Sequence, residues 1–242
     1  MNKCFIPIFI LALCACIGLG PKPALAKLPN VIKHAEGDIR YTFGYWPVVV
    51  IGGGALTAGL LSLKDHSFQN NFKTRHLGRF DTVAKYFGEY YVLDPAAFLL
   101  FGAGKLFHNE ELVVTGETLV ESLLFTQAMT GVLKLGFNRT RPNGGNYSFP
   151  SGHAANTFAV ATVLETLYGL KAGIPGYLAA GLVSYSRLDA NDHFLSDLVF
   201  GAALGSAIGW GTAHFHKMKN PNLYVLPMIG ASKGLSFVYN FK

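Results

Sequence analysis

Two histidines in the second half of the chain have neighbours that could prepare an imidazole for chemistry. His193 is followed four residues later by Asp197, within the segment SRLDANDHFLSD. Residues four apart share one face of a helix, so the carboxylate could accept a proton from one ring nitrogen and leave the other nitrogen as a directed lone pair. The spacing therefore predicts that both residues lie on a helix beginning near Asp189, Asn191 or Asp192, with His193 as a nucleophile. The alternative is an ordinary pair on a helix surface.

The other histidine lies at the start of a small and apolar run, in FPSGHAANTFA. Ser151 is a favourable N-cap, and Gly152 allows the backbone to come close to a ligand. The first amides of the following helix would then form an anion site. His153, in the first turn, would lie beside that anion and could exchange a proton with it.

Three basic residues accompany the two histidines. Lys134 closes an apolar run and Arg141 follows in KLGFNRTRP, while Arg187 precedes the His193 segment. An ammonium supplies a point charge and a guanidinium supplies a planar fork, and both suit a phosphate. Alone, each could be a basic helix end that complements the helix dipole.

Together, these residues match the requirements of in-line phosphoryl transfer through a phosphohistidine. Lys134, Arg141 and Arg187 would hold the nonbridging oxygens, where the transition state spreads its charge. His193 would attack phosphorus, and His153 would protonate the leaving oxygen and later activate water. No carboxylate cluster indicates a metal site, so we expect neither a metal nor another cofactor.

These residues must be positioned by helices. Apolar runs with few charges predict about six helices, many of them short for a full membrane span. The runs cover residues 46–63, 95–104, 111–135, 154–170, 172–185 and 198–213. The region 64–85 is expected to be a loop with a short surface helix. Glu117 and Glu121, one turn apart, are expected to form a solvated or headgroup-facing stripe and not an acid/base pair. Residues 223–242 favour a short β-hairpin-like tail. The predicted fold class is all-α, with residues 27–222 as the helical domain.

The first 26 residues are typical of an export signal, with Lys3, an apolar core and an A-x-A site ending at Ala26. An uncleaved anchor helix and a lipoprotein site at Cys16 are the alternatives. All three cysteines lie in this segment, so cleavage would remove every possible disulfide.

Only 14% of residues are charged, against about 25% in typical soluble domains, which favours contact with a membrane. The net charge of +6 comes without a basic run, so nucleic acid is not an expected partner.

The three motifs, K-x6-RP at 134–142, PSGH at 150–153 and SR-x5-H-x3-D at 186–197, resemble the signature of the type 2 phosphatidic acid phosphatase superfamily. The resemblance implies a helical bundle without a metal requirement. It also implies the residue roles given above, with Ser151 and Gly152 among the phosphate-binding groups. The implied substrates are phosphate monoesters or diphosphates, often of lipids. The layout is similar to that of envelope members in Gram-negative bacteria, so we expect an inner-membrane or periplasmic location with the site facing the periplasm.

Four alternatives remain open at the level of sequence. A secreted acid phosphatase of broad specificity would use the same residues on small phosphate esters. A vanadium-dependent haloperoxidase would hold vanadate in the same cage. A membrane bundle could bind a phosphate headgroup without chemistry, and a phosphotransferase could pass the phosphoryl group to an alcohol. The oligomeric state is not indicated by the sequence.

Overall fold

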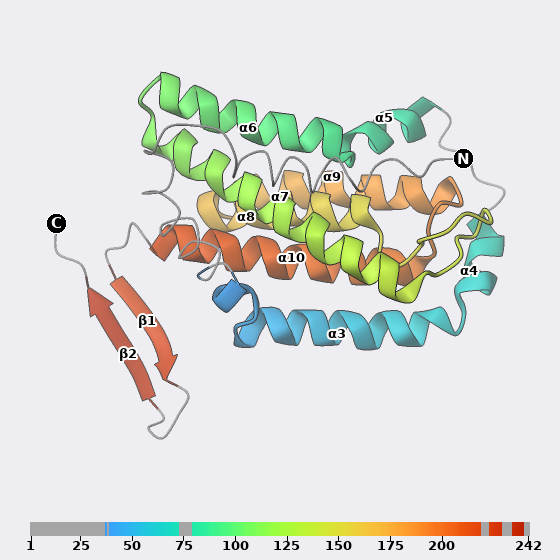
Figure 1. The fold of residues 1–242 in the computed structure, drawn as a ribbon. Helices are drawn as coiled ribbons and strands as arrows, with labels where there is room; N and C mark the ends of the chain where they lie inside the picture. Colours follow the sequence, from blue (N-terminus) through green and yellow to red (C-terminus); the bar gives the residue numbers. More distant parts are fainter. Residues whose placement is uncertain (1–36, 38, 73–78, 219–222, 229–233, 240–242) are drawn as a thin grey trace, which may run out of the picture. The chain divides into compact units, whose positions relative to one another are not determined.

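The computed structural model describes residues 37, 39–72, 79–218, 223–228 and 234–239. Its helices are α3 (Tyr45–Ser62), α4 (Asp65–Phe72), α5 (Arg79–Phe87), α6 (Tyr90–Leu106), α7 (Glu110–Phe137), α8 (Gly152–Tyr168), α9 (Leu170–Asp189) and α10 (Leu195–Met218) (Figure 1). Within these residues, six helices have 17 residues or more. The prediction of a helical bundle is confirmed.

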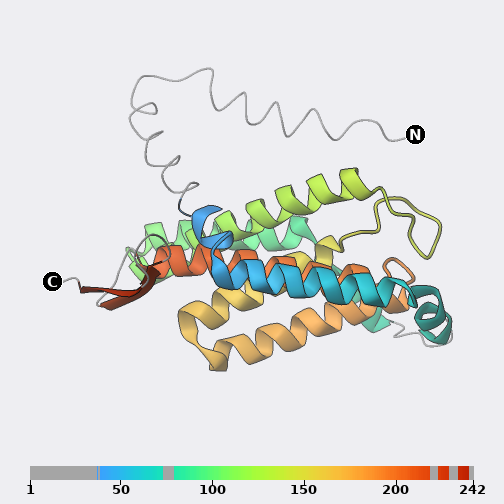
Figure 2. The ribbon, with the colours of Figure 1, turned by 90° about the horizontal axis from the view of Figure 1, so that it is seen from below.

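The long helices run alongside one another, with α10 and α8 at the centre (Figures 1 and 2). Helix α10 packs against α8, α3 and α7, while α6 pairs with α7 and α8 pairs with α9. Short turns connect the antiparallel pairs, and Gly169, with φ of +77°, makes the turn between α8 and α9. A side chain at that φ would be strained, so glycine permits this tight reversal.

Helices α8 and α10 approach each other at the level of their backbones. A Cβ atom added to Gly205 would lie only 2.0 Å from the carbonyl oxygen of Ala155, and one at Gly201 would lie 2.6 Å from that of Ser151. Small residues at such a seam let two helices pack more closely than larger side chains allow. This seam fixes the start of α8 against the start of α10, which carry the two histidine motifs.

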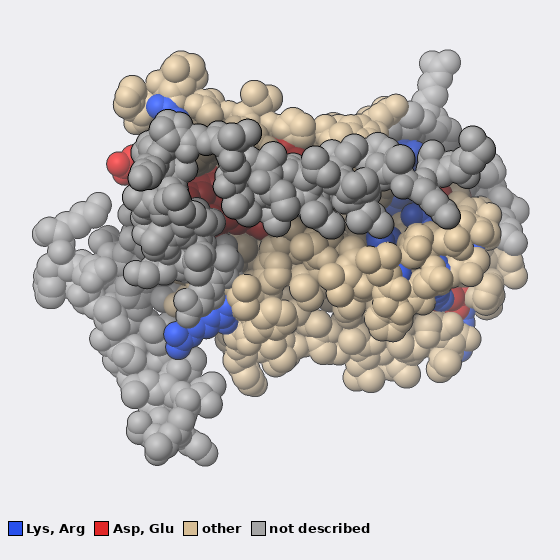
Figure 3. Space-filling model, viewed as in Figure 1, with Lys and Arg blue, Asp and Glu red and all other residues tan. Residues whose placement is uncertain are grey.

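Two helices have the length and apolar composition needed to cross a membrane, considering only the described residues. They are α3, over Tyr45–Ser62, and α10, over Leu195–Lys217. Helix α10 is mostly enclosed by its neighbours, whereas α3 exposes side chains such as Val49, Leu56 and Leu60. Figure 3 shows almost no charge on the face over α3, with the basic and acidic side chains gathered toward the ends. Such a face suits lipid.

Several local predictions differ from the structure. The region expected to be a loop with one short surface helix contains two helices, α4 and α5. Helix α4 exposes His66, Ser67 and Asn70, while Asp65 and Gln69 on its other face are buried. Glu121 does not belong to a solvated stripe, since its Oε2 lies 2.6 Å from Nε2 of the buried His216. That contact joins α7 to α10, and no local pattern predicts it.

The C-terminal tail contains strands β1 (Leu223–Met228) and β2 (Gly234–Tyr239). They pair antiparallel, with Leu223 opposite Tyr239 and Met228 opposite Gly234. The predicted export signal at residues 1–26 lies outside the described residues.

Candidate functional site

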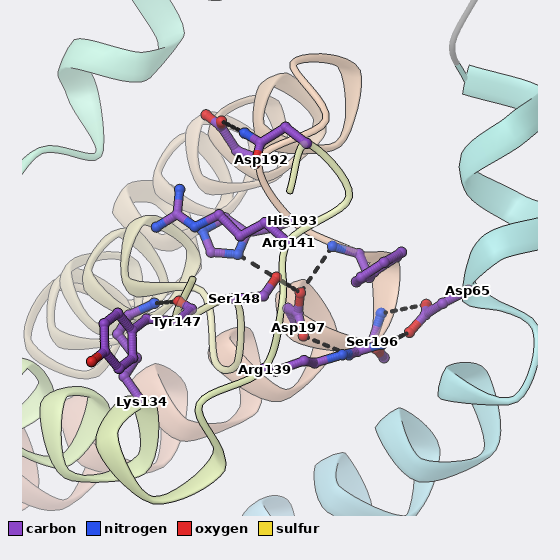
Figure 4. A network of polar contacts seen from close by, with 12 residues as sticks. Asp65, Lys134, Arg139, Arg141, Tyr147, Ser148, Asp192, His193, Ser196 and Asp197 are labelled. Atoms are coloured by element: carbon purple, nitrogen blue, oxygen red, sulfur yellow. Dashed lines mark hydrogen bonds and ion pairs between the residues drawn. The ribbon is translucent and has the colours of Figure 1, made fainter. Parts of the chain in front are cut away.

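The three predicted motifs meet where α7 ends and where α8 and α10 begin. Figure 4 shows residues of the first and third motifs, with Arg141 beside His193 and Asp197. The first spans the last turn of α7 and the loop after it, the second opens α8, and the third connects α9 to α10. Helix α7 ends at Asn138, whose φ of 40° turns the chain into the loop that carries Arg141. The backbone amide of Ser151 donates to the carbonyl of Asp197 at 3.1 Å, which joins the second motif to the third.

His193 lies in the turn before α10 and not on the helix, which corrects the prediction. Helix α10 begins at Leu195, so only Asp197 is in its first turn. Nδ1 of His193 lies 3.8 Å from Oδ2 of Asp197, and the imidazole is 2% exposed. The carboxylate lies on the Nδ1 side of the ring, but Nδ1 makes no hydrogen bond within the described residues, and Nε2 is the nitrogen on the other side of the ring. Burial is the main cause that lowers the pKa of His193, which favours the neutral imidazole that a nucleophile requires.

Asp197 is held by donors on several sides. Its Oδ1 accepts from Nη1 of Arg139 at 2.7 Å, and its Oδ2 accepts from Oγ of Ser148 at 2.5 Å. Oδ2 also accepts from the backbone amide of Phe194 at 2.9 Å, as an acidic residue in the third helical position does in a capping box. The fully buried carboxylate therefore has a fixed orientation, and it can fix the ring of His193 in turn.

Arg139 connects this carboxylate to a second one on α4. Its Nη2 donates to Oδ2 of Asp65 at 2.7 Å, and its Nη1 donates to Oγ of Ser196 at the same distance. Oγ of Ser196 donates to Asp65, which also accepts from the Ser196 amide at 3.2 Å. The guanidinium lies over the ring of Phe194, with its carbon 4.4 Å from the ring centre. Helix α4 is therefore part of the support for the site.

The three predicted cations surround the His193 turn from different elements. Nζ of Lys134 donates to the carbonyl of Tyr147 at 2.7 Å, and Nε of Arg141 donates to that of Asn146 at 3.0 Å. Arg187, 1% exposed on α9, donates from Nη1 to Oδ2 of Asp192 at 2.9 Å. Lys134 and Arg141 lie near enough to His193 for their charges to lower its pKa.

The start of α8 presents a hydroxyl without a partner. Ser151 occupies the N-cap position, but its side chain makes no capping hydrogen bond, contrary to the prediction. Within the described part of the chain, its buried Oγ has no hydrogen-bond partner. Gly152 follows at the first helical position, with only a Thr130 methyl near the place a side chain would take. An anion at this helix end could accept from Oγ of Ser151 and from the free first-turn amides.

His153 lies between the cations and a carboxylate that the sequence did not single out. Burial lowers the pKa of His153 to about 3. The nearby charges that add to this lowering come from Arg187, His193, Lys85 and Arg141. Nε2 of His153 lies 3.3 Å from Oε1 of Glu89 but makes no hydrogen bond within the described residues.

Sequence reasoning missed five residues around this site: Asp65, Glu89, Arg139, Ser148 and Ser196. Arg139 lies inside the first motif, but nothing in the sequence indicates a partner for it. Asp65 and Glu89 lie far before the motifs in the chain, and no local spacing relates them to Asp197 or His153. All eight predicted site residues lie in the three converging segments, and their roles remain predictions.

Lys134 gives a prediction for the pH dependence of phosphate binding. Burial, followed by the charge of Arg141, lowers the pKa of Lys134 from 10.5 to about 8. The ammonium is therefore charged below pH 8 and loses its proton above it. We expect kcat/KM for a phosphate ester to fall about tenfold per pH unit above pH 8. Lys134→Arg should remove this fall, because a guanidinium stays charged. An unchanged basic limb in this variant would exclude Lys134 as its cause.

Comparisons with known proteins agree on one family. A profile of the PAP2 superfamily matches residues 117–221. A lipid A 1-phosphatase of Porphyromonas gingivalis is 38% identical over 101 residues, which are 39% of this chain and only 23% of that protein. A lipid A 4'-phosphatase of Helicobacter pylori is 30% identical over 146 residues, covering 52% of this chain and 71% of that protein. A transmembrane PAP2-type phosphatidylglycerolphosphate phosphatase of Bacillus subtilis has a similar fold, with a TM-score of 0.61 and 21% identity over 71% of this chain and 96% of that one.

Proposed function

This chain belongs to the PAP2 superfamily, and from that membership and its site we propose that it is a phosphoric ester hydrolase that removes phosphate from a lipid. The family is the one that the three sequence motifs indicated. The observation that carries the proposal is the convergence of His193–Asp197, His153 and three cations at one end of the bundle. A protein that only binds phosphate has no need of an oriented imidazole, which argues against a simple headgroup binder.

The first chemical step forms a bond from Nε2 of His193 to phosphorus. Asp197 faces Nδ1 and stabilises the positive charge that develops on the ring. The P–O bond to the lipid breaks on the opposite side, and His153 donates a proton to the departing oxygen. The products of this step are the dephosphorylated lipid and a phosphohistidine.

The second step returns the enzyme to its starting state. Water attacks phosphorus, His153 takes its proton, and the P–N bond to His193 breaks to release inorganic phosphate. Lys134, Arg141 and Arg187 hold the nonbridging oxygens throughout, together with the amides at the start of α8. These protein cations supply the neutralisation that a divalent metal supplies in many phosphoryl-transfer enzymes.

We propose lipid A as the substrate class, acted on in a bacterial envelope with the site facing the periplasm. Two relatives are lipid A phosphatases, although this chain spans only a quarter of the first of them. Membrane embedding is supported by the apolar, exposed α3 and by the length of α10. Phosphatidylglycerol phosphate, phosphatidic acid and an isoprenoid diphosphate present the same end group and are the competing substrates.

Phosphate release from purified protein in detergent tests the proposal directly. We expect the highest kcat/KM for lipid A among the four lipids, and much lower values for small esters such as 4-nitrophenyl phosphate. Equal rates on small esters and lipids would instead indicate an acid phosphatase of broad specificity. No release from any phosphate ester would contradict the proposed activity.

Orthovanadate and EDTA test two features of the proposed reaction, its transition state and its independence of metal. Orthovanadate should inhibit, since its trigonal-bipyramidal adduct resembles the transition state, and EDTA should leave the rate unchanged. Loss of activity in EDTA would reveal a required metal. Halide oxidation in the presence of vanadate and peroxide, without phosphatase activity, would favour the haloperoxidase alternative.

A further inference from the structure

We propose that Glu89 is a positioning residue for His153, so that the site contains two histidine–carboxylate pairs and not one. This inference rests on the proposed phosphatase function and adds a residue that lies outside the three motifs. Asp197 orients the nucleophile, and Glu89 orients the general acid. Nε2 of His153 lies 3.3 Å from Oε1 of Glu89, which is an ion-pair distance without hydrogen-bond geometry, and Nδ1 is the ring nitrogen that we assign to the ester oxygen.

The approach of Glu89 to His153 is built into the turn between α5 and α6. Glu89 is the N-cap residue of α6, with an extended backbone and without a side-chain capping bond. Its carboxylate is therefore not used by its own helix. The side chains of Glu89 and His153 are 14% and 20% exposed, so the contact is shielded from most of the solvent.

The residue before Glu89 must be small for this contact to exist. A Cβ atom on Gly88 would lie 2.8 Å from the ring carbon Cδ2 of His153 and 2.7 Å from a methyl of Val183. Any other residue at this position would push the turn away from the ring. Gly88 thus lets the backbone of the turn contact the imidazole, and the next residue brings the carboxylate to Nε2.

The charges around His153 explain why a carboxylate is needed there. The groups that face it are positive or become positive: Arg187 from α9, Lys85 from α5, Arg141 from the loop after α7, and His193. All of them oppose a protonated imidazole, yet a general acid must carry a proton when the ester bond breaks. A bound phosphate supplies negative charge for part of the cycle, and Glu89 supplies it throughout.

Glu89 acts on the two proton transfers through the position and the charge of the His153 ring. In the first step, the proton moves from Nδ1 of His153 to the leaving oxygen, and the neutral ring keeps its Nε2 hydrogen on the side of the Glu89 carboxylate. In the second step, Nδ1 takes a proton from the attacking water, and the carboxylate stabilises the resulting imidazolium. Both steps depend on the same ring orientation.

If Glu89 positions the general acid, the loss of kcat/KM in a Glu89 variant should depend on the leaving group of the ester. A purely structural role would lower kcat/KM equally for all esters. An alkoxide needs a proton to depart, whereas 4-nitrophenolate does not. We expect Glu89→Gln to lower kcat/KM for octyl phosphate by about 10- to 100-fold and that for 4-nitrophenyl phosphate by less than about threefold. Because kcat/KM covers only the steps up to phosphohistidine formation, later hydrolysis does not mask the difference. Glu89→Asp should recover part of the loss on octyl phosphate.

The control is Glu111→Gln, the same change at an exposed residue in the first turn of α7, at the other end of that helix from Lys134. It should match wild type on both esters. His153→Ala serves as the reference and should show the same selective loss as Glu89→Gln, but larger. If Glu89→Gln lowered kcat/KM equally for the two esters, or did not lower it at all, the inference about Glu89 would be overturned. The activity of the wild-type protein would still support the proposed function. If wild-type protein hydrolysed neither ester and none of the lipids, the proposed phosphatase function would itself be contradicted.

Discussion

Replacing His193 by alanine is expected to lower phosphatase turnover by about a thousandfold or more, because the protein loses the only atom proposed to bond to phosphorus. The imidazole is 2% exposed, and its Nδ1 lies 3.8 Å from Asp197. Water cannot replace Nε2 at the same place without a new base to activate it. The rate that remains would come from the cations and amides that still bind the ester.

The sharpest measurement is the phosphorylated enzyme itself. Wild-type protein quenched in alkali during turnover of a radiolabelled ester should retain up to one phosphate per chain, since phosphohistidine survives base and is lost in acid. His193→Ala should retain none. Label retained in this variant would place the nucleophile elsewhere.

His108→Asn is the matched control for the loss of an imidazole. His108 is exposed between α6 and α7, and its φ of 55° is a conformation that asparagine tolerates better than alanine. This variant should keep wild-type activity and thermal stability. His193→Ala should also remain folded, with a helical circular dichroism spectrum like that of wild type, because the lost side chain makes few polar contacts.

Asp197→Asn is expected to reduce both activity and stability. The carboxylate is fully buried and accepts hydrogen bonds from Arg139, Ser148 and the amide of Phe194. An amide group in its place would direct N–H toward another donor and leave the guanidinium of Arg139 without part of its countercharge. Breaking a buried ion pair costs about 3–5 kcal/mol, so a large fall in thermal midpoint should follow.

The effect of Asp197→Asn on chemistry is separate from its effect on folding. Without the carboxylate, His193 loses the group that selects its tautomer, and a comparable change in serine proteases lowers kcat about 10⁴-fold. We expect kcat to fall about 10²- to 10⁴-fold at a temperature where circular dichroism shows the variant folded. KM should change much less, because the cations that bind phosphate remain.

Two control variants show whether a fall in kcat is specific to the loss of the Asp197 carboxylate. Asp94→Asn keeps the acceptor for Gln127, which donates to Oδ1 of Asp94 at 2.7 Å, and should leave kcat unchanged. Ser148→Ala removes one donor to Asp197 without adding an N–H group, and should lower kcat less than Asp197→Asn does. If folded Asp197→Asn kept wild-type kcat, the carboxylate would have a structural role only.

The predictive power of the sequence was greatest for the helices and for the three motifs. Long apolar runs such as residues 46–63 became helices with ends close to those expected, because the hydrogen bonds of a helix join backbone groups only four residues apart and the run contains no charged residue. The motifs were recognisable because Lys134, Arg141, His153, Arg187, His193 and Asp197 combine unusual residue types at short spacings.

The sequence was least informative where a residue's function depends on a distant partner. His193 was expected on the helix with Asp197, but α10 begins at Leu195 because Asp197 caps the amide of Phe194 and ends the turn there. The four-residue spacing does bring Nδ1 of His193 to 3.8 Å from the Asp197 carboxylate, but the two residues do not share the helix that the spacing predicted. A capping interaction of this kind competes with helix extension, and the outcome depends on the surrounding packing.

The sequence by itself determined that the chain forms a helical bundle and carries phosphate-binding and histidine motifs, since both are written in short-range patterns of residue type. Only the tertiary structure decided that Arg139 joins Asp197 to Asp65 and that Glu89 faces His153. Arg139 is 58 residues from Asp197 and 74 from Asp65, and Glu89 is 64 residues from His153. These partners meet because α8 and α10 pack backbone to backbone and the α5–α6 turn contacts the start of α8. Such contacts arise from the packing of whole helices, which no local spacing encodes.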